Sequence, residues 1–160
     1  MNQWISMWGN AISFTERRPE SYAKNITLRY PIYVPFHGEA LRFTFDNYCG
    51  TEKIDITKAT VSLSPVNMKD KVGLTCPMYE KQVQDITFFS NTDVTILPND
   101  HIISDPVFID LNAGDTICVN LYFANYTSMQ SAVLVTGPLS KGYFSIGDMT
   151  KVGTLPLEET

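Results

Sequence analysis

Hydrophobic and polar residues alternate with a period of two along most of the chain. One parity of the segment 27–36 is apolar: Leu28, Tyr30, Ile32, Val34 and Phe36. Arg29 and Tyr33 fall on the opposite parity. Because successive side chains of a strand point to opposite faces, this pattern predicts a half-buried strand. Pro31 and Pro35 cannot donate to a ladder, so we expect one side of this strand to be an edge or to be bulged.

A second alternating segment follows the turn His37-Gly38-Glu39. Leu41, Phe43 and Phe45 share one parity, and Arg42 takes the other. Two alternating runs separated by a short glycine-containing turn are typical of a hairpin, so we expect the two segments to pair with each other.

The next apolar segment changes parity in its middle. Ile54 and Ile56 lie on one parity, whereas Ala59, Val61 and Leu63 lie on the other. A bulge or break near Thr57-Lys58 would keep one apolar face continuous. Residues 64–84 carry little pattern, so we expect a long loop there, with a short helical turn at residues 78–82.

Short strands return after this loop. The alternation marks them at residues 85–89, 93–97, 101–111, 116–124, 131–137 and 142–146. Eight or so short strands without an amphipathic helix predict an all-β fold, an antiparallel β-sandwich of jelly-roll type, over residues 1–150. Residues 151–160 are expected to be a linker or a truncated end. The predicted core consists of Leu28, Ile32, Val34, Leu41, Phe43, Phe45, Val61, Leu63, Val107, Ile117, Val119 and Leu121.

Composition agrees with one compact domain and narrows its partners. The chain has 160 residues, of which 44% are hydrophobic and only 18% are charged, with a net charge of −5. The charged share is below the roughly 25% of ordinary soluble domains, so much of the surface must be neutral and polar. Arg17-Arg18 is the one local basic run. Nucleic-acid binding needs clustered cations, so no such partner is expected.

The sequence also bears on location and redox state. No apolar run approaches the roughly 20 residues of a membrane-spanning helix, and the first residues lack the features of a signal peptide. We therefore predict a cytoplasmic protein without a membrane partner. Cys49, Cys76 and Cys118 are far apart and lack zinc-ligand spacing, so we expect reduced and mostly buried thiols.

Candidate catalytic and metal-binding residues have simpler explanations. His101, Ser104 and Asp105 include the side chains of a nucleophilic triad, but positions 101 and 104 have opposite parity on a strand. Aspartates recur at regular intervals where turns are expected: Asp100, Asp105, Asp110 and Asp115. Calcium is an open but less favoured explanation of them. No phosphate-binding motif occurs. We predict no catalytic residue, no metal and no cofactor.

Surface aromatics are the most open feature. Tyr33 and Tyr122 lie on the parity opposite the core, and Arg42 points outward on its own strand. Exposed aromatic rings can be isolated surface residues, part of a domain interface, or platforms on which sugar rings stack. Tyr33, Arg42 and Tyr122 are therefore the predicted binding or interface residues. Arg29 and Arg42 are expected to pair with carboxylates on a sheet face or at an interface.

Several motifs taken together resemble one family. They are Trp4 and Trp8 at the start, Thr27-Leu28-Arg29, Gly38 with Leu41-Arg42, Asn47 with Gly50, Ser104-Asp105-Pro106-Val107, and Ala113-Gly114-Asp115. In this order and spacing, they resemble the amino-terminal β-sandwich domain that precedes the catalytic domain in a branch of the SGNH (GDSL-type) hydrolases. The resemblance covers nearly the whole chain.

The resemblance implies a non-catalytic role for this chain. The family's nucleophile lies in a Gly-Asp-Ser block of a separate α/β domain, and its base lies in an Asp-x-x-His pair; neither occurs here. Gly147-Asp148-Met149-Thr150 has methionine at the serine position, so we interpret it as a turn. The expected function is an accessory domain that packs on the catalytic SGNH domain of the same parent esterase or acylhydrolase. The alternative is a stand-alone module that binds a carbohydrate or an acylated sugar.

Overall fold

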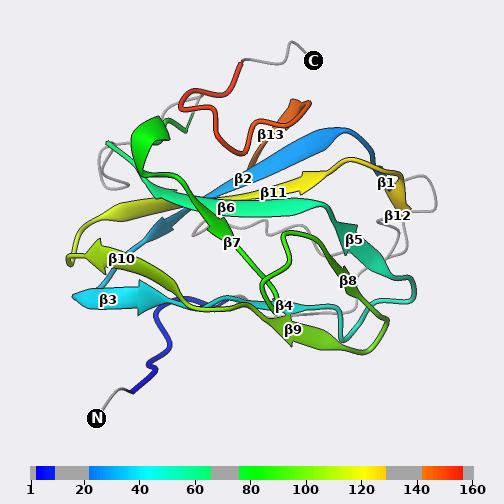
Figure 1. Ribbon diagram of the computed structural model, residues 1–160, viewed down its shortest axis with the longest axis horizontal. Coiled ribbons are helices and arrows are strands. Elements are labelled where there is room, and N and C mark those ends of the chain that lie inside the picture. The colour runs from blue at the N-terminus through cyan, green and yellow to red at the C-terminus, as the bar shows by residue number, and fades with distance from the viewer. Residues whose placement is uncertain (1–2, 10–21, 66–75, 129–141, 157–160) are drawn as a thin grey trace.

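The fold is all-β with antiparallel sheets, as predicted. The computed structural model describes residues 3–9, 22–65, 76–128 and 142–156. Its largest sheet has five strands in the order β13-β2-β11-β6-β7 (Figure 1). These strands are β13 (Tyr143–Ile146), β2 (Ile26–Tyr33), β11 (Thr116–Phe123), β6 (Lys58–Leu63) and β7 (Gln84–Ile86). A short 3-10 helix, η2 (Glu80–Gln82), precedes β7.

The remaining strands form two-stranded antiparallel ladders. β3 (Gly38–Leu41) pairs with β10 (Val107–Leu111), and β4 (Thr44–Asp46) pairs with β9 (His101–Ile103). β5 (Ile54–Ile56) pairs with β8 (Val94–Ile96), and β1 (Tyr22–Ala23) pairs with β12 (Thr127–Ser128). Figure 1 shows the β3-β10 and β4-β9 ladders beneath the five-stranded sheet. The finer jelly-roll description of this arrangement stays a prediction.

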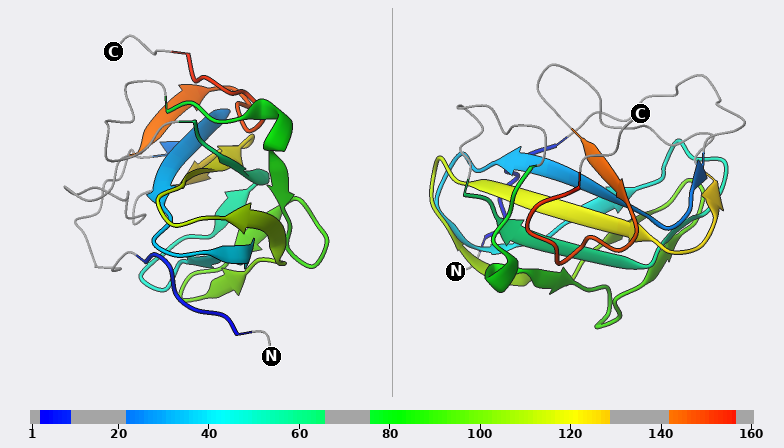
Figure 2. Two further views of the ribbon diagram at one scale, coloured as in Figure 1. Left: turned by 90° about the vertical axis from the view of Figure 1, so that its left-hand side faces the viewer. Right: turned by 90° about the horizontal axis from the view of Figure 1, so that it is seen from above.

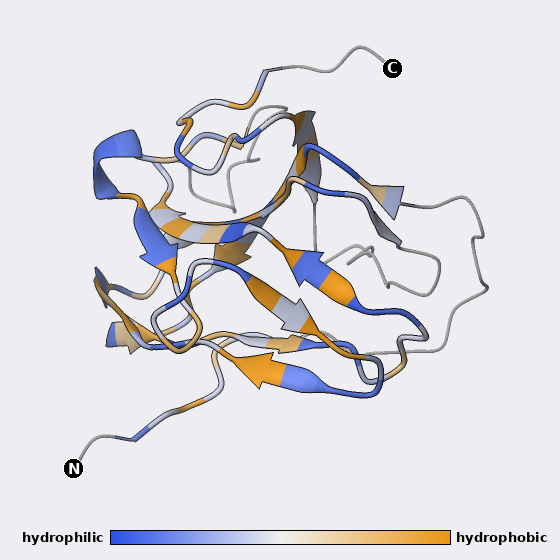
Figure 3. Cartoon of the chain, turned by 45° about the vertical axis from the view of Figure 1, so that its right-hand side comes forward, coloured by the Kyte–Doolittle hydropathy of each residue, from blue (hydrophilic) through white to orange (hydrophobic). Residues whose placement is uncertain are grey.

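The apolar core lies between the five-stranded sheet and the ladders. Every residue of the predicted core either is buried in this cluster or packs against it. Val61 and Ile117 from the large sheet are fully buried, and Val107 from β10 is 4% exposed. Along the strands, hydrophobic and hydrophilic bands alternate (Figure 3). The period-two pattern therefore identified the inner face correctly.

The predicted hairpin between residues 27–36 and 40–48 is wrong. β2 pairs with β11 and β13, whereas β3 pairs with β10. The backbone of Val34 ties the end of β2 to the turn before β11, since its N–H donates to the Asp115 carbonyl at 2.8 Å and its carbonyl accepts from Gly114 N. The chain then crosses to the other layer. The two apolar faces meet across the core instead of side by side in one sheet.

Two local predictions about strand ends are confirmed. The ladder between β13 and β2 ends at Arg29, so Pro31 lies beyond it and is an edge position on that side among the described residues. The parity change near Thr57 is a real break: β5 pairs with β8, and β6 enters the large sheet. The N–H of Thr57 donates to the Tyr122 carbonyl at 2.9 Å at the crossing point. Of the predicted strands, residues 131–137 lie outside the described residues.

Residues 151–156 are packed on the five-stranded sheet, unlike the linker that the sequence suggested for 151–160. Leu155 is 3% exposed, and the Met78 N–H donates to the Gly153 carbonyl at 2.8 Å. Residues 157–160 lie outside the described residues. The C-terminal stretch therefore belongs to the fold at least as far as Leu155.

Candidate functional site

The outer face of the five-stranded sheet is polar and buried, which makes it the most unusual part of the molecule. We call it the covered polar face, and it consists of Thr27, Arg29, Thr60, Ser62, Cys118 and Asn120, all of them fully buried. The ladder register places Asn120 between Arg29 and Thr60, and Cys118 between Pro31 and Ser62. Two stretches, residues 76–83 and 147–155, cover it. Figure 2 shows the second stretch crossing over β11 and β6.

Arg29 is the centre of this face. Its Nε donates to Asn120 Oδ1 at 2.6 Å. Nη1 donates to the carbonyls of Cys76 and Gly153, at 3.0 and 3.1 Å. Nη2 donates to the carbonyls of Met149 and Val152, at 3.0 and 2.5 Å. A guanidinium has five N–H donors, so this number of bonds can satisfy the whole group and fastens both covering stretches to the sheet.

The expected pairing of Arg29 with a carboxylate is wrong. All its hydrogen-bond acceptors are neutral, namely four backbone carbonyls and one side-chain amide. Burial lowers the pKa of Arg29 from its ordinary value because the charged form loses hydration, while the neighbouring thiols Cys118 and Cys76 act in the opposite direction. Carbonyl dipoles take the place of water around the buried cation.

Two thiols lie against this arginine. The Sγ atoms of Cys76 and Cys118 are 3.4 Å apart, and both residues are fully buried. The hydrogen bond between the two thiols lowers the pKa of Cys118, and the charge of Arg29 adds to this effect against the opposing effect of burial. The same hydrogen bond raises the pKa of Cys76, and burial raises it further. Cys118 is therefore the more acidic thiol. The prediction of buried cysteines is confirmed for this pair, whereas Cys49 is half-buried.

Hydroxyl groups of the same face hold the covering stretches at further points. Thr27 Oγ1 donates to the Gly147 carbonyl at 2.7 Å and accepts from Met149 N. Thr60 Oγ1 donates to the Thr150 carbonyl at 2.6 Å. Residues 147–150 are irregular: Gly147 is a bend at φ +91°, Asp148 Oδ1 accepts from Thr150 N at 3.0 Å, and the backbone turn itself lies over residues 149–152, where Val152 N donates to the Met149 carbonyl at 3.1 Å. Among the described residues, every buried side-chain nitrogen and oxygen has a partner, so the polar face is fully satisfied.

Tyr33 and Tyr122 lie on the outer face as predicted, but they do not form a shared platform. Tyr33 is opposite Thr116 at one end of the β2-β11 ladder, and Tyr122 is opposite Thr27 at the other. Six residues of strand separate the two positions, about 20 Å. The Tyr122 hydroxyl donates to Asn25 Oδ1 at 2.8 Å. Covered residues occupy the face between the two rings.

Arg42 lies in the other layer, so the structure does not bring the three predicted residues together. Its guanidinium stacks on the Trp4 ring, with Cζ 4.6 Å from the centroid. Phe108 is opposite Ala40, and Ile103 is opposite Thr44, so both share the outward parity of Arg42. Trp4, Ile103 and Phe108 are 46%, 45% and 76% exposed. We call Trp4, Arg42, Ile103 and Phe108 the Trp4 surface.

The side chains of the candidate triad serve the fold. Ser104 Oγ donates to the Asp105 carbonyl at 2.9 Å and accepts from Phe43 N at 3.0 Å. Since its single proton goes to that carbonyl, it does not donate to His101. Asp105 Oδ2 accepts from Ser90 N and Thr87 Oγ1, and the first of these bonds is the main cause that lowers its pKa. Within residues 3–9, 22–65, 76–128 and 142–156, no three acidic, histidine or cysteine side chains are grouped to hold a metal.

Other residues of the family motifs also have structural roles. Asn47 Nδ2 donates to the carbonyls of Glu52 and Ile96, at 2.9 and 3.2 Å. A Cβ added to Gly50 would lie 1.8 Å from Asn47 Oδ1, so only glycine fits there. Gly114 adopts φ +96°, which favours glycine. The expected role of Asn47 in the turn into Gly50 is confirmed.

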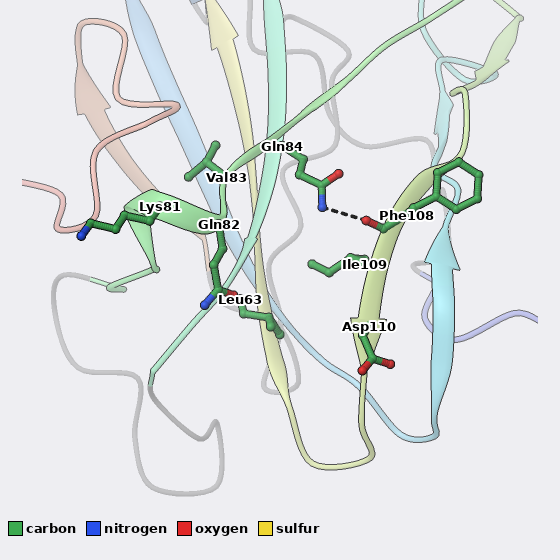
Figure 4. Close-up of a pocket in the computed structure, with 8 residues that line it drawn as sticks. All are labelled: Leu63, Lys81, Gln82, Val83, Gln84, Phe108, Ile109 and Asp110. Carbon is green, nitrogen blue, oxygen red and sulfur yellow. Dashed lines mark hydrogen bonds between the residues drawn. The ribbon is translucent and has the colours of Figure 1, made fainter.

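A shallow groove of about 500 Å³ lies between β7 and β10. Its polar lining is Lys81, Gln82, Gln84 and Asp110. Gln84 Nε2 donates to the Phe108 carbonyl at 2.8 Å across the groove, while the Phe108 ring turns away from Gln84 (Figure 4). The lining has one basic and one acidic residue, Lys81 on η2 and Asp110 on β10, and the Lys81 side chain points away from Asp110 (Figure 4).

Comparison with known proteins adds no relative: no protein-family model and no curated protein matches the chain. In the described part of the chain, no helix is long and apolar enough to cross a membrane. The alternation of polar and apolar residues did not identify Arg29 as a hub. The sequence does place Arg29, Asn120 and Thr60 on the outward parity of their strands, and this was the available signal. Residues of that parity usually lie on the exposed face of a sheet.

Proposed function

We propose that this chain is a non-catalytic accessory domain of an SGNH-type esterase or acylhydrolase and that it packs on the catalytic domain of its parent protein. The Trp4 surface is the observation that carries this proposal. Three large apolar side chains, Trp4, Ile103 and Phe108, remain about half or more exposed on one face of the β3-β10 and β4-β9 ladders. Interface cores are enriched in aromatic residues and arginine.

The geometry of this surface favours a rigid partner. Phe108 is fixed by ladder pairing to Ala40 in β3, and Ile103 is fixed by pairing to Thr44 in β4, four residues or at most about 13 Å further along the chain. Arg42 is midway in sequence between Ala40 and Thr44, and its guanidinium stacks on the Trp4 ring. Met7 packs against the core and anchors the segment that carries Trp4. Aromatic and apolar groups fixed in advance lose little entropy when a partner binds.

The roles of the motif residues support the non-catalytic part of the proposal. Arg29, Asn47, Gly50, Ser104 and Asp105 carry the family resemblance, and each is used in hydrogen bonds or close packing inside the fold. A signature made of such residues marks a fold rather than a reaction centre.

Hydrolysis of p-nitrophenyl acetate by the purified chain tests the lack of catalysis. We expect no turnover above that of buffer and of a heat-unfolded sample. A rate that saturates with substrate and persists in Ser104→Ala would contradict the proposal, because the chain would then have its own catalytic centre elsewhere.

Docking is tested with the parent protein. The reading frame downstream of Thr160 should encode a Gly-Asp-Ser block, and its absence would contradict the assignment to this class. The domain containing that block, expressed separately, should bind the chain, and Phe108→Ser with Ile103→Ser should weaken binding at least tenfold. Phe144→Ser is the matched control, because Phe144 is 50% exposed on β13, away from the Trp4 surface. Equal loss in both variants would reject this surface as the interface.

Carbohydrate binding is the second candidate, and the polar groove of Figure 4 favours it. Lys81, Gln82, Gln84 and Asp110 offer donors and acceptors of the kind that sugar hydroxyls need. Tyr33 and Tyr122 could stack a sugar only at separate sites. Calorimetry against plant and bacterial polysaccharides should show binding that is lost in Gln82→Ala with Asp110→Ala. Flat titrations across the panel would eliminate this function.

A further inference from the structure

The paired thiols of the covered polar face are not used by the proposed function. Cys118 lies in the middle of β11, where it is opposite Pro31 on one side and Ser62 on the other. Cys76 lies on the covering stretch 76–83. The Sγ atoms are 3.4 Å apart, against about 2.05 Å in a disulfide, so only a small displacement separates the dithiol from the bonded state.

Both backbones are held in place around the sulfur atoms. The Cys76 carbonyl accepts from Arg29 Nη1 at 3.0 Å, and the next carbonyl, of Pro77, accepts from Ser64 Oγ at 2.6 Å. Cys76 adopts φ +41°, a left-handed conformation that residues with a Cβ rarely take. The fold thus imposes an unfavourable backbone angle on Cys76 and keeps its sulfur beside Cys118.

We propose that Cys76 and Cys118 are a peroxide-sensitive pair that closes to an intramolecular disulfide and locks the covering stretch 76–83 onto β11. Hydrogen peroxide is hardly larger than water, so it reaches a buried thiol through small local openings that would exclude a bulky reagent. The hydrogen bond between the two thiols and the cation of Arg29 favour the thiolate of Cys118, which makes Cys118 the attacking sulfur.

The chemistry balances with peroxide as the only oxidant. The Cys118 thiolate attacks one peroxide oxygen, the O–O bond breaks, and hydroxide leaves, which gives a sulfenic acid on Cys118. The Cys76 sulfur then attacks the Cys118 sulfur. The S–S bond forms, the S–O bond breaks, and the departing hydroxyl takes the Cys76 proton as water. Two thiols lose two electrons, and one peroxide becomes two waters.

The Cys49→Ser variant isolates the pair for the experiment. The folded protein is treated with hydrogen peroxide, quenched, unfolded and alkylated, and its intact mass is measured. We expect a species that has lost two hydrogen atoms and takes up no alkyl group, with a peptide linking Cys76 to Cys118. The same treatment of protein kept in denaturant should give far less of this species, because the unfolded chain does not hold together two sulfurs that are 42 residues apart in sequence.

Two further measurements define the outcome. The oxidised protein should melt on the order of 10 °C higher than the reduced one, and dithiothreitol should reverse the change. In Cys49→Ser/Cys76→Ser, Cys118 should stop at the sulfenic acid, which dimedone traps when the protein is then unfolded in its presence. If both thiols remain open to alkylation under peroxide that fully oxidises Cys49 in the wild type, the proposal is overturned. Cross-links between chains in place of the internal one would also overturn it.

Discussion

The two faces of the five-stranded sheet are built by opposite means. On β11, Ile117 and Val119 point into the apolar core, while Cys118 and Asn120 point to the covered polar face. The inner face gains stability from burial, which has no directional requirement. The outer face depends on hydrogen bonds from fixed side chains to the carbonyls of two irregular stretches.

This difference follows from what covers each face. Strands cover the inner face, and their own ladders satisfy their backbone groups. Residues 76–83 and 147–155 have few such ladders, so their carbonyls need donors from elsewhere when they are buried. Arg29 supplies up to five donors at one point. A hydrophobic outer face could not hold these loops, because their carbonyls would remain unpaired.

The largest expected effect comes from breaking the inner face. Phe43 packs against the apolar core, so Phe43→Asp places an unpaired charge there and should cost more than about 4 kcal/mol. We expect loss of the cooperative thermal transition in circular dichroism. Phe43→Leu is the control and should keep a cooperative melt. A melt of Phe43→Asp at the wild-type temperature would refute the placement of this residue.

Removing the hub of the outer face should come next. Arg29→Met leaves four carbonyls and the Asn120 amide without their donor, so we expect a loss of about 3–4 kcal/mol in guanidinium unfolding. Hydrogen exchange should accelerate at the amides of Met78 and Gly153 before it does at the strands. Arg42→Met removes an exposed arginine and should cost less than about 1 kcal/mol. Equal losses of unfolding free energy in Arg29→Met and Arg42→Met would mean that the buried hydrogen bonds of Arg29 stabilise the fold no more than an exposed arginine does.

A titration to alkaline pH distinguishes the two faces of the five-stranded sheet, because each face has a tyrosine whose pKa is raised. Tyr30 shares the inner parity with Val119, and burial raises its pKa from 10.0 to about 12. Because the folded pKa lies above the unfolded one, the neutral ring stabilises the fold below pH 10, and this stability is lost as the pH rises from about 10 to 12. The loss should be about 2 kcal/mol. Ultraviolet titration of the phenolate measures it.

Tyr30→Phe is the control for that titration and should remove the late phenolate step together with the matching loss of stability. Tyr143 on the outer face has its pKa raised mainly by burial, and the thiols Cys76 and Cys118 add to the rise. Tyr143→Phe should leave the step near pH 12 in place. If the phenolate step near pH 12 disappears in Tyr143→Phe instead, the assignment of that step to Tyr30 on the inner face is incorrect.

The smallest effect is expected from a substitution that adds a methyl group to the covering stretch 147–155. A Cβ added to Gly153 would lie 3.0 Å from the Met78 carbonyl oxygen and 2.8 Å from Glu80 Cγ, so Gly153→Ala should push residues 147–155 slightly off the sheet. We expect a loss of about 1 kcal/mol in chemical unfolding. Gly38→Ala meets nothing within 4 Å and serves as the control. A gain in unfolding free energy in Gly153→Ala would show that residues 147–155 are loosely packed on the sheet.

The local pattern predicted much of the fold. The alternation in residues 27–36 and 116–123 gave the strands and their inner faces, because side-chain direction in a strand depends only on position along it. The break at Thr57 was also visible, since parity is local. Strand pairing was not visible in the local pattern. We expected β2 to pair with β3, but it pairs with β11, whose residues lie about 90 positions away in the sequence, as in the Arg29–Asn120 pair.

The candidate site divides in the same way. The sequence by itself determined that Arg29 and Tyr33 share one face of their strand and that Tyr122 points away from the core on its own strand, because side-chain direction follows parity. Only the tertiary structure decided that Arg29 is buried while the two tyrosines end up far apart at the rim. The reason is the cover: the carbonyl of Gly153, 124 residues from Arg29, closes over the middle of the face, and no local pattern encodes a contact of that range.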